Sequence, residues 1–259
     1  MVYFKICIKL IDRINESIIM KNTVFVLLVA LTPVWVSGQK TMKDANVEVR
    51  NVGSFHAIHI SNAFDLYLTQ AGEEAVAVSA AQEKHRDKIT TKVVNGVLII
   101  SFNDKSSWFG NKGNKKLKAY VSFKSINKLK VSGACDVYVN GSINAEKLDL
   151  SISGASDIRS AEIFAESMTV SLNGASDIRQ LKGKVTRLRV EAHGASDFHG
   201  YDLQTEYCDA EAHGASDIRI SVSKELNARA SGASDIHYKG AASLRSSKSG
   251  TASGVSRRG

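Results

Sequence analysis

Gly133-Ala134-Cys135-Asp136-Val137 is the stretch that decides the fold, because nearly the same five residues return five more times along the chain. Successive glycines lie 18 to 22 residues apart, and a degenerate seventh copy is Ser253-Gly254-Val255-Ser256. A period of about 20 residues is typical of a solenoid, in which each repeat forms one coil that stacks on its neighbours. The six clear copies begin at Gly133, Gly154, Gly174, Gly194, Gly214 and Gly232.

The residues around each glycine alternate between apolar and polar side chains. Before Gly154, for example, apolar Leu150 and Ile152 alternate with polar Asp149 and Ser151. Alternation of period two predicts a strand with one buried and one exposed face. A further apolar position follows each glycine by four residues, at Val137, Ile158, Ile178, Phe198, Ile218 and Ile236. Each coil is therefore expected to add strands to parallel sheets stacked along one axis.

We predict an all-β fold, a parallel β-helix (β-solenoid) with coils of about 20 residues. The intervals between the turns are too short for crossover helices, and the single proline, Pro33, interrupts no ladder. Residues 47–123 differ, since they form alternating runs without the repeated phrase, and Asn95-Gly96 between two runs predicts a hairpin. This N-terminal β segment is expected to start or cap the solenoid, because an open sheet end invites edge-to-edge association.

Residues 1–38 are expected to lie outside the folded domain. Met20-Lys21-Asn22, the apolar run 23–36 and the small residues Ser37-Gly38 are typical of a signal peptide whose removal leaves Gln39 first. Residues 1–19 then form an upstream extension. The alternative is a membrane anchor, although the run is short for a span. The prediction is an exported protein with no transmembrane segment in the mature chain.

The mature chain is divided into a short linker, 39–46, and a single solenoid domain, 47–258. Within that domain the N-terminal strands occupy 47–123 and the repeats occupy 124–258.

The whole chain has a net charge of +8, and the leader carries four basic and two acidic residues, which leaves +6 after cleavage. This balance permits contact with anionic glycans, but no nucleic-acid motif is present, so nucleic acid is not an expected partner.

The two cysteines of the mature chain, Cys135 and Cys208, are expected to be buried and unpaired. They lie three coils apart, which corresponds to roughly 14 Å along the solenoid axis. A disulfide requires Cα atoms within about 7 Å of each other.

One aspartate in each copy of the phrase would form a column along the solenoid. Stacked carboxylates repel one another, so the column needs compensating charge. Calcium is one solution, because this ion takes several oxygen ligands. The other is structural: Arg159, Arg179 and Arg219 stand two residues after their aspartates and would form a parallel basic column. We favour the structural interpretation for Asp136, Asp157, Asp177, Asp197, Asp217 and Asp235.

No catalytic residue, metal site or cofactor is predicted. His193 and His213 precede their glycines in adjacent coils and would stack, but no third metal ligand accompanies them. A catalytic triad requires one unique arrangement with an oriented base, whereas serine, histidine and aspartate repeat here as columns. The sequence also lacks a nucleophile elbow, a zinc-protease motif and a phosphate loop.

One unrepeated stretch, residues 106–116, is the candidate ligand-binding segment. Aromatic and basic side chains on a glycine-rich loop suit stacking on sugars or contact with anionic surfaces. The alternative is that the two aromatic rings fold back over the open end of the solenoid. The candidate residues are Trp108, Phe109, Lys112, Lys115 and Lys116.

Several of these stretches resemble a bacterial envelope family that is common in Bacteroidetes, the putative autotransporter adhesin, head GIN domain family. The resemblance rests on the leader before Gln39, on residues 50–58, on the Asn95-Gly96 hairpin and on the Ser-Gly-Ala-Ser-Asp-Ile repeats, and it covers roughly residues 47–258. It implies a β-helical protein of the envelope or exterior, and it brings no catalytic residues.

The expected function is therefore that of a non-enzymatic, exported, adhesin-like or cell-envelope binding or scaffold protein. Surface glycans and envelope proteins are the expected partners. The alternative is a carbohydrate-active β-helix enzyme acting on polysaccharide, which would need a cleft with a unique cluster of carboxylates.

Overall fold

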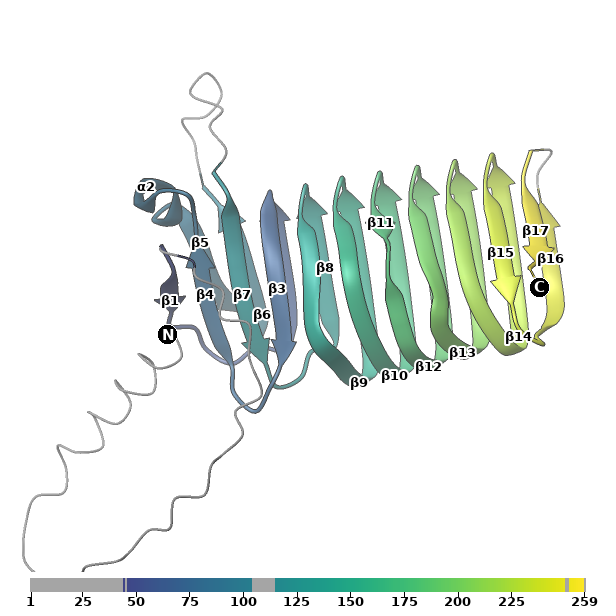
Figure 1. The fold of residues 1–259 in the computed structure, drawn as a ribbon, viewed down its shortest axis with the longest axis horizontal. Helices are drawn as coiled ribbons and strands as arrows, with labels where there is room; N and C mark the ends of the chain where they lie inside the picture. The colour runs from purple at the N-terminus through teal and green to yellow at the C-terminus, as the bar shows by residue number, and fades with distance from the viewer. Residues whose placement is uncertain (1–43, 45, 104–114, 250–251, 259) are drawn as a thin grey trace, which may run out of the picture. The chain divides into compact units, whose positions relative to one another are not determined.

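A computed structural model of the chain describes residue 44 and residues 46–103, 115–249 and 252–258. Residues 46–259 form one compact unit, whose strands join in a single hydrogen-bonded sheet that folds back on itself (Figure 1). In the described part the sole helix is α2 (Glu83–Arg86), a single turn. The strands are β1 (Glu48–Arg50), β2 (Ala57–Asn62), β3 (Phe64–Gln70), β4 (Ala75–Ser79), β5 (Ile89–Val94), β6 (Val97–Phe102), β7 (Leu117–Phe123), β8 (Lys128–Gly133), β9 (Asp136–Gly154), β10 (Asp157–Gly174), β11 (Asp177–Ile178), β12 (Leu181–Gly194), β13 (Asp197–Gly214), β14 (Asp217–Gly232), β15 (Asp235–Lys239), β16 (Ser243–Ser249) and β17 (Gly254–Arg257).

The predicted parallel β-solenoid is confirmed. Each long strand runs along one wall of the solenoid, bends, and returns along the other wall, as the row of arrows in Figure 1 shows. We call the wall that ends at the glycines the glycine wall, and the wall that begins at the aspartates the aspartate wall. Pairing is parallel and in register: Met168 lies between Leu148 and Leu188, and Gly174 lies between Gly154 and Gly194. Equivalent residues therefore stack directly over most of each coil, with register shifts between β9 and β10, between β13 and β14, and between β14 and β16.

The N-terminal segment forms the first end of the solenoid. On the glycine wall β2 pairs in parallel with β8 and β6, and β5 then pairs antiparallel with β6 through the Asn95-Gly96 hairpin. On the aspartate wall β3 pairs in parallel with β9 and β7, and β4 and β1 follow antiparallel. Both hairpin residues have positive φ, 50° and 73°, which explains the choice of asparagine and glycine. The parallel stack thus ends in antiparallel strands on both walls.

A further copy of the repeated phrase lies in this segment. Asn62 stacks on Gly133, and Asp65 stacks on Asp136 in the same register as the later coils. Asn62 has a φ of 87°, so it adopts the left-handed conformation that glycine has in the other coils. The sequence pattern missed this copy because asparagine replaces the glycine and Phe64 replaces the serine. The first full coil therefore starts before the clear repeats.

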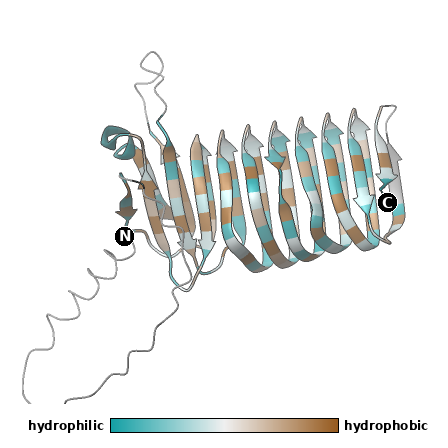
Figure 2. Cartoon of the chain, in the orientation of Figure 1, coloured by the Kyte–Doolittle hydropathy of each residue, from teal (hydrophilic) through white to brown (hydrophobic). Residues whose placement is uncertain are grey.

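The core fills the space between the two walls. Apolar and polar residues alternate along the long strands (Figure 2), and the inward side chains, such as those of Leu150, Ile152 and Ile158, are at most 2% exposed. Phe198 is also fully buried, in the coil where the last inward residue of the glycine wall before the turn is the small Ala192. Gly200 makes further room for it, because a Cβ at Gly200 would lie 2.4 Å from the Phe198 ring. The large ring is thus accommodated by small neighbours in its own coil.

Glycine is required at the turn for two reasons, which Gly194 illustrates. Its φ is 89°, a conformation that a side chain disfavours. A Cβ at this position would also lie 2.5 Å from the carbonyl oxygen of Gly174 in the preceding coil. The turns therefore stack more closely than any residue with a side chain permits.

The serine after each turn is buried as well, which the sequence pattern alone did not indicate. Ser196 is fully buried; its hydroxyl donates to the carbonyl oxygen of His193 at 3.1 Å and accepts from the backbone N–H of Ser176 at 3.3 Å. The next coils repeat this arrangement, since the hydroxyl of Ser216 accepts from the N–H of Ser196. The serines form an internal hydrogen-bonded column that satisfies one buried amide in each coil.

We predict that Gly194→Ala strongly destabilises the protein. The backbone strain alone costs on the order of 1–3 kcal/mol, and the contact with the Gly174 carbonyl adds to it. Gly72→Ala is the matched control, because nothing lies within 4 Å of a Cβ there, and its effect should stay within about 0.5 kcal/mol. Urea unfolding of both variants measures the difference. Equal midpoints would show that the turn does not depend on glycine.

Candidate functional site

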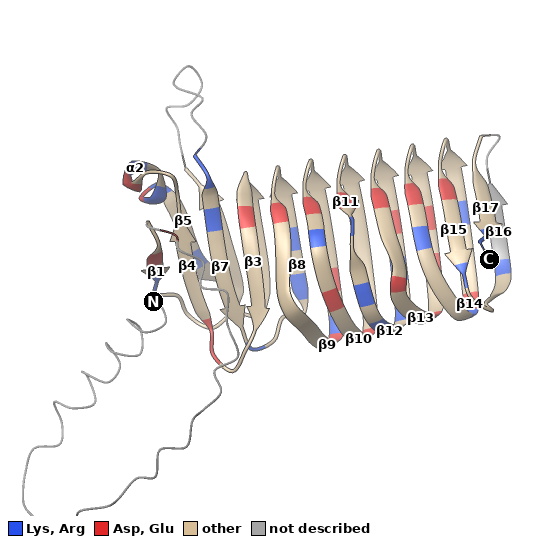
Figure 3. Cartoon of the chain, viewed as in Figure 1, with Lys and Arg blue, Asp and Glu red and all other residues tan. Residues whose placement is uncertain are grey.

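The outward side of the aspartate wall carries a column of aspartates with arginines beside it. Arg159 donates from Nε to Asp136 at 2.9 Å and from Nη2 to Asp157 at 3.3 Å. Arg179 repeats the arrangement with Asp157 and Asp177, both at 3.0 Å. Each guanidinium therefore bridges the carboxylates of its own coil and the preceding coil. Figure 3 shows the acidic row crossing successive strands.

The aspartates also accept hydrogen bonds from the backbone. The N–H of Asp177 donates to Oδ1 of Asp157 at 3.3 Å, and the N–H of Asp197 donates to Oδ1 of Asp177 at 3.1 Å. The N–H of Asp217 donates to Asp197 in the same way. One carboxylate oxygen thus binds the next coil while the other oxygen binds an arginine. These contacts compensate the like charges without an ion.

The arginine column is interrupted at His199. His199 Nε2 lies 3.7 Å from Asp197, and Arg219 turns its guanidinium toward His199 Nε2 at 2.7 Å and Asp217 at 3.2 Å. Asp197 therefore has no arginine within ion-pair distance among the described residues. Its compensation depends on the histidine and on the backbone of the next coil.

Toward the N-terminal end the basic column is replaced by tyrosines. Tyr67 stacks between Tyr120 and Tyr138, with ring centroids 5.1 Å apart on both sides. Beside them, burial raises the pKa of Asp65, and the nearby charge of Asp136 raises it further, against the opposing effects of Lys118 and Arg159. The surroundings of Asp65 therefore favour its protonated form more than those of a free carboxyl group do.

The segment predicted to bind a ligand lies largely outside the described residues. Trp108, Phe109 and Lys112 are all among the residues that the structure does not describe. Lys115 is described, and its ammonium lies over the Phe102 ring, 4.6 Å from the centroid. Lys116, which follows it, has a φ of 45°. For this loop the ligand-binding role stays a prediction.

The stacked histidines lie on the glycine wall. The rings of His193 and His213 are 4.9 Å apart and nearly parallel, and His213 Nδ1 lies 2.6 Å from the Ser231 hydroxyl. Within the described residues no group of three or more histidine, cysteine, aspartate or glutamate side chains is arranged to hold a metal ion. The geometry of the pair is accounted for by stacking and by the serine.

The cysteines are buried and free of disulfides. Cys135 takes the place of the turn serine, and its N–H donates to the hydroxyl of Ser156 at 3.1 Å. Burial raises the pKa of both Cys135 and Cys208, away from the range of a reactive thiolate. Neither thiol is suited to nucleophilic chemistry.

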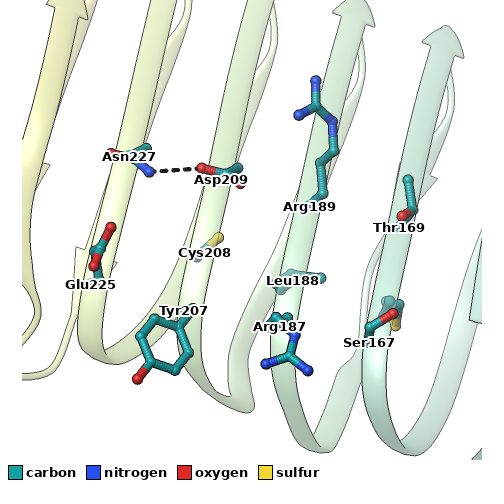
Figure 4. Close-up of a pocket in the computed structure, with 11 residues that line it drawn as sticks. Ser167, Thr169, Arg187, Leu188, Arg189, Tyr207, Cys208, Asp209, Glu225 and Asn227 are labelled. Atoms are coloured by element: carbon teal, nitrogen blue, oxygen red, sulfur yellow. Dashed lines mark hydrogen bonds between the residues drawn. The ribbon is translucent and has the colours of Figure 1, made fainter. Parts of the chain in front are cut away.

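A shallow hollow of about 320 Å³ lies on the outer side of the glycine wall and crosses four coils (Figure 4). Its surface is formed by two neighbouring columns of outward side chains. In one, Arg187 and Tyr207 are register partners on β12 and β13. In the other, Asn227 donates to Asp209 at 2.9 Å. The hollow thus combines an exposed aromatic ring with hydrogen-bonding groups of both kinds.

The sequence pattern did not reveal this hollow. Its outer column occupies the position seven residues before each glycine, which differs in every coil. The repeated phrase marks the turn, which is nearly the same in every coil. The position seven residues before each glycine varies, and there one coil can differ chemically from the next. That column is Lys147, Ser167, Arg187, Tyr207 and Glu225.

The fold defines the protein as a parallel β-solenoid with an N-terminal end closed by antiparallel strands. Its residues 54–242 match the family described as "Putative auto-transporter adhesin, head GIN domain". This match spans most of the chain, and the protein belongs to that family. No match was found among curated proteins.

Solved structures of the same architecture come from species of Bacteroides and Parabacteroides. A putative adhesin of Bacteroides fragilis is 20% identical with a TM-score of 0.77, covering 84% of this chain and 98% of that one. A putative adhesin of Parabacteroides merdae is 16% identical with a TM-score of 0.65, covering 84% and 97%. A putative lipid binding protein of Parabacteroides distasonis is 18% identical with a TM-score of 0.61, covering 83% and 98%. At these identities the similarity shows the fold alone.

We predict that the aspartate column does not depend on calcium. Asp177→Asn keeps an oxygen for the N–H of Asp197 and loses an exposed ion pair worth about 0.2–1 kcal/mol. Asp177→Ala removes the acceptor too and should cost more, about 1–3 kcal/mol. Thermal melts with millimolar calcium and with chelator should coincide. A calcium-dependent rise of several degrees that Asp177→Asn abolishes would make the column a metal site.

We also predict that Asp65→Asn becomes less stable relative to the wild type as the pH falls. Because the pKa of Asp65 is raised above 3.8 in the folded state, the folded protein binds this proton more tightly than the unfolded chain does. The wild type therefore gains stability relative to Asp65→Asn as the pH falls through the raised pKa, and the gain ends below 3.8. Urea unfolding from neutral to acidic pH measures it. A difference that does not change with pH would contradict the raised pKa.

Proposed function

We propose that the chain is a non-enzymatic, exported protein of the cell envelope that acts as an adhesin-like binding protein or scaffold. The observation that carries this proposal is the regularity of the outer surface, since in-register coils present ordered polar columns over two rigid walls. A surface of this kind offers many equivalent contacts along one direction and suits an extended partner. The family is named for adhesion, in agreement with such a role.

Surface glycans and envelope proteins are the proposed partners. The loop with Trp108, Phe109, Lys112, Lys115 and Lys116 is proposed as one contact region, because aromatic and basic side chains together recognise sugars and anionic groups. Nucleic acid is not proposed, since the charged side chains of the described walls largely pair with one another.

Catalysis is not part of the proposal. A glycoside hydrolase needs two carboxylates with separate roles on either side of a bond. Asp157 and Asp177 instead bind arginines and backbone amides in the same way in successive coils. A carbohydrate-active enzyme thus lacks a supporting observation among the described residues.

Export is proposed from the leader, with cleavage before Gln39. Among the described residues there is no helix with the length and hydropathy needed to span a membrane. N-terminal sequencing of the native protein after cell fractionation tests this step. An intact Met1 or Met20 on the native protein would contradict it.

We expect the exported full chain to bind at least one component of an array of surface glycans and solubilised envelope proteins. Trp108→Ala should weaken that binding if the loop contributes a stacking ring, whereas Lys92→Ala, an exposed change outside the loop, should not. The array is read before and after prolonged incubation. Absence of binding to every component, or the appearance of hydrolysed glycan, would overturn the proposal.

A further inference from the structure

We propose that the hollow around Tyr207 and a second hollow around Phe164 together form a binding site for an uncharged oligosaccharide. The inference rests on the proposed surface-binding function and assigns it a site and a ligand class. It starts from the exposed apolar side chains. Among the described residues only two exposed large hydrophobic side chains are aromatic, Phe164 at 41% and Tyr207 at 39%, and each lines a hollow.

The second hollow, of about 500 Å³, lies at the bend between the two walls. Phe164 lines it together with Asn144, Glu166, Lys184 and Thr186 from three successive coils. Asparagine, glutamate, lysine and threonine supply both donors and acceptors around the ring. The first hollow offers the same kinds of groups, since Arg187, Asp209 and Asn227 line it together with Tyr207.

The two hollows adjoin. Glu166 lines the second and Ser167 the first, and likewise Thr186 lines the second and Arg187 the first. The ion pair between Arg187 Nη2 and Glu166 Oε1, at 2.7 Å, joins the two rims. Phe164 and Tyr207 are separated by two coils, roughly 10 Å along the axis. A ligand that contacts both rings must therefore be longer than one sugar unit.

The chemistry of the surface fits a sugar. A pyranose has an apolar face of C–H groups, which packs on an aromatic ring, and a rim of hydroxyls that bind carboxylate, amide and guanidinium groups. The ammonium of Lys224 covers one face of the Tyr207 ring, 5.3 Å from its centroid, and is held by Glu206 at 2.7 Å. Arg187 and Glu225 flank Tyr207 in the preceding and following coils, so the ligand packs on the part of the ring that is exposed.

The acidic and basic side chains that line the two hollows balance one another, which favours an uncharged ligand. Three basic side chains face four acidic ones across the two hollows, and most of them are paired within the protein. A polyanion gains little from such a surface, although the whole chain is basic. The basic side chains are Lys184, Arg187 and Arg189, and the acidic ones are Glu146, Glu166, Asp209 and Glu225.

The test is calorimetric titration of the full chain with uncharged glucose and N-acetylglucosamine oligomers, from disaccharide to hexasaccharide, and with heparin as the polyanion. We expect at least one neutral series to bind, with affinity rising with length. Tyr207→Ala should weaken hexasaccharide binding about tenfold, and Tyr207→Phe should retain it. Phe164→Ala should weaken the hexasaccharide but not the disaccharide. Tyr201→Ala is the matched control on the aspartate wall, and melting curves establish that each variant is folded.

The outcomes separate this inference from the proposed function. If the chain binds a glycan or an envelope protein and Trp108→Ala abolishes binding while Tyr207→Ala and Phe164→Ala do not, the hollows are not the site and the proposed function stands. Binding of heparin but of no neutral oligomer overturns the ligand class. If the chain binds nothing in the titration and nothing on the array, both this inference and the proposed function are overturned.

Discussion

The structure depends on one constraint, the direct stacking of each residue on its counterpart in the next coil. The constraint is most severe at the turn, where the carbonyl oxygen of Gly174 occupies the place that a Cβ of Gly194 would need. Every coil in the clear repeats has glycine at this position, and Asn62 in the first coil shares the left-handed backbone conformation of these glycines. The serine column follows from the same stacking, because each buried amide finds its acceptor one coil further on.

In-register stacking also multiplies electrostatic conflicts. One aspartate per coil becomes a row of like charges, and the protein resolves the row with groups that repeat at the same interval. Backbone amides and guanidinium groups recur along the column, so Asp157 and Asp177 each accept from an arginine on their own coil and from donors on the next coil. Where the repeat is broken, at His199 and at Asp65, the compensation is weaker.

The sequence predicts the repeats and the N-terminal hairpin, but not the features that depend on how side chains from different coils come together. The period of the glycines predicted the parallel coils, and the hairpin at Asn95-Gly96 formed where expected. The sequence pattern did not predict the copy at Asn62, because asparagine replaces the glycine. The left-handed backbone conformation is retained. The hollow around Tyr207 could not be predicted, because it depends on side chains from several coils that are adjacent only after the register is known. Invariant positions therefore identify the scaffold, and variable outward positions give each coil its own surface.

The surfaces that meet between successive coils resemble one another, and this similarity affects how such a chain can evolve. Because the upper and lower faces of neighbouring coils are alike, a gene segment encoding one coil can be duplicated or deleted by unequal recombination without creating a mismatched junction. The antiparallel strands at the N-terminal end are not affected by such an event, since they contact only the first coils. Each added coil lengthens the walls by one strand spacing, about 4.8 Å. The reach of the molecule can thus change in discrete steps while its ends remain the same.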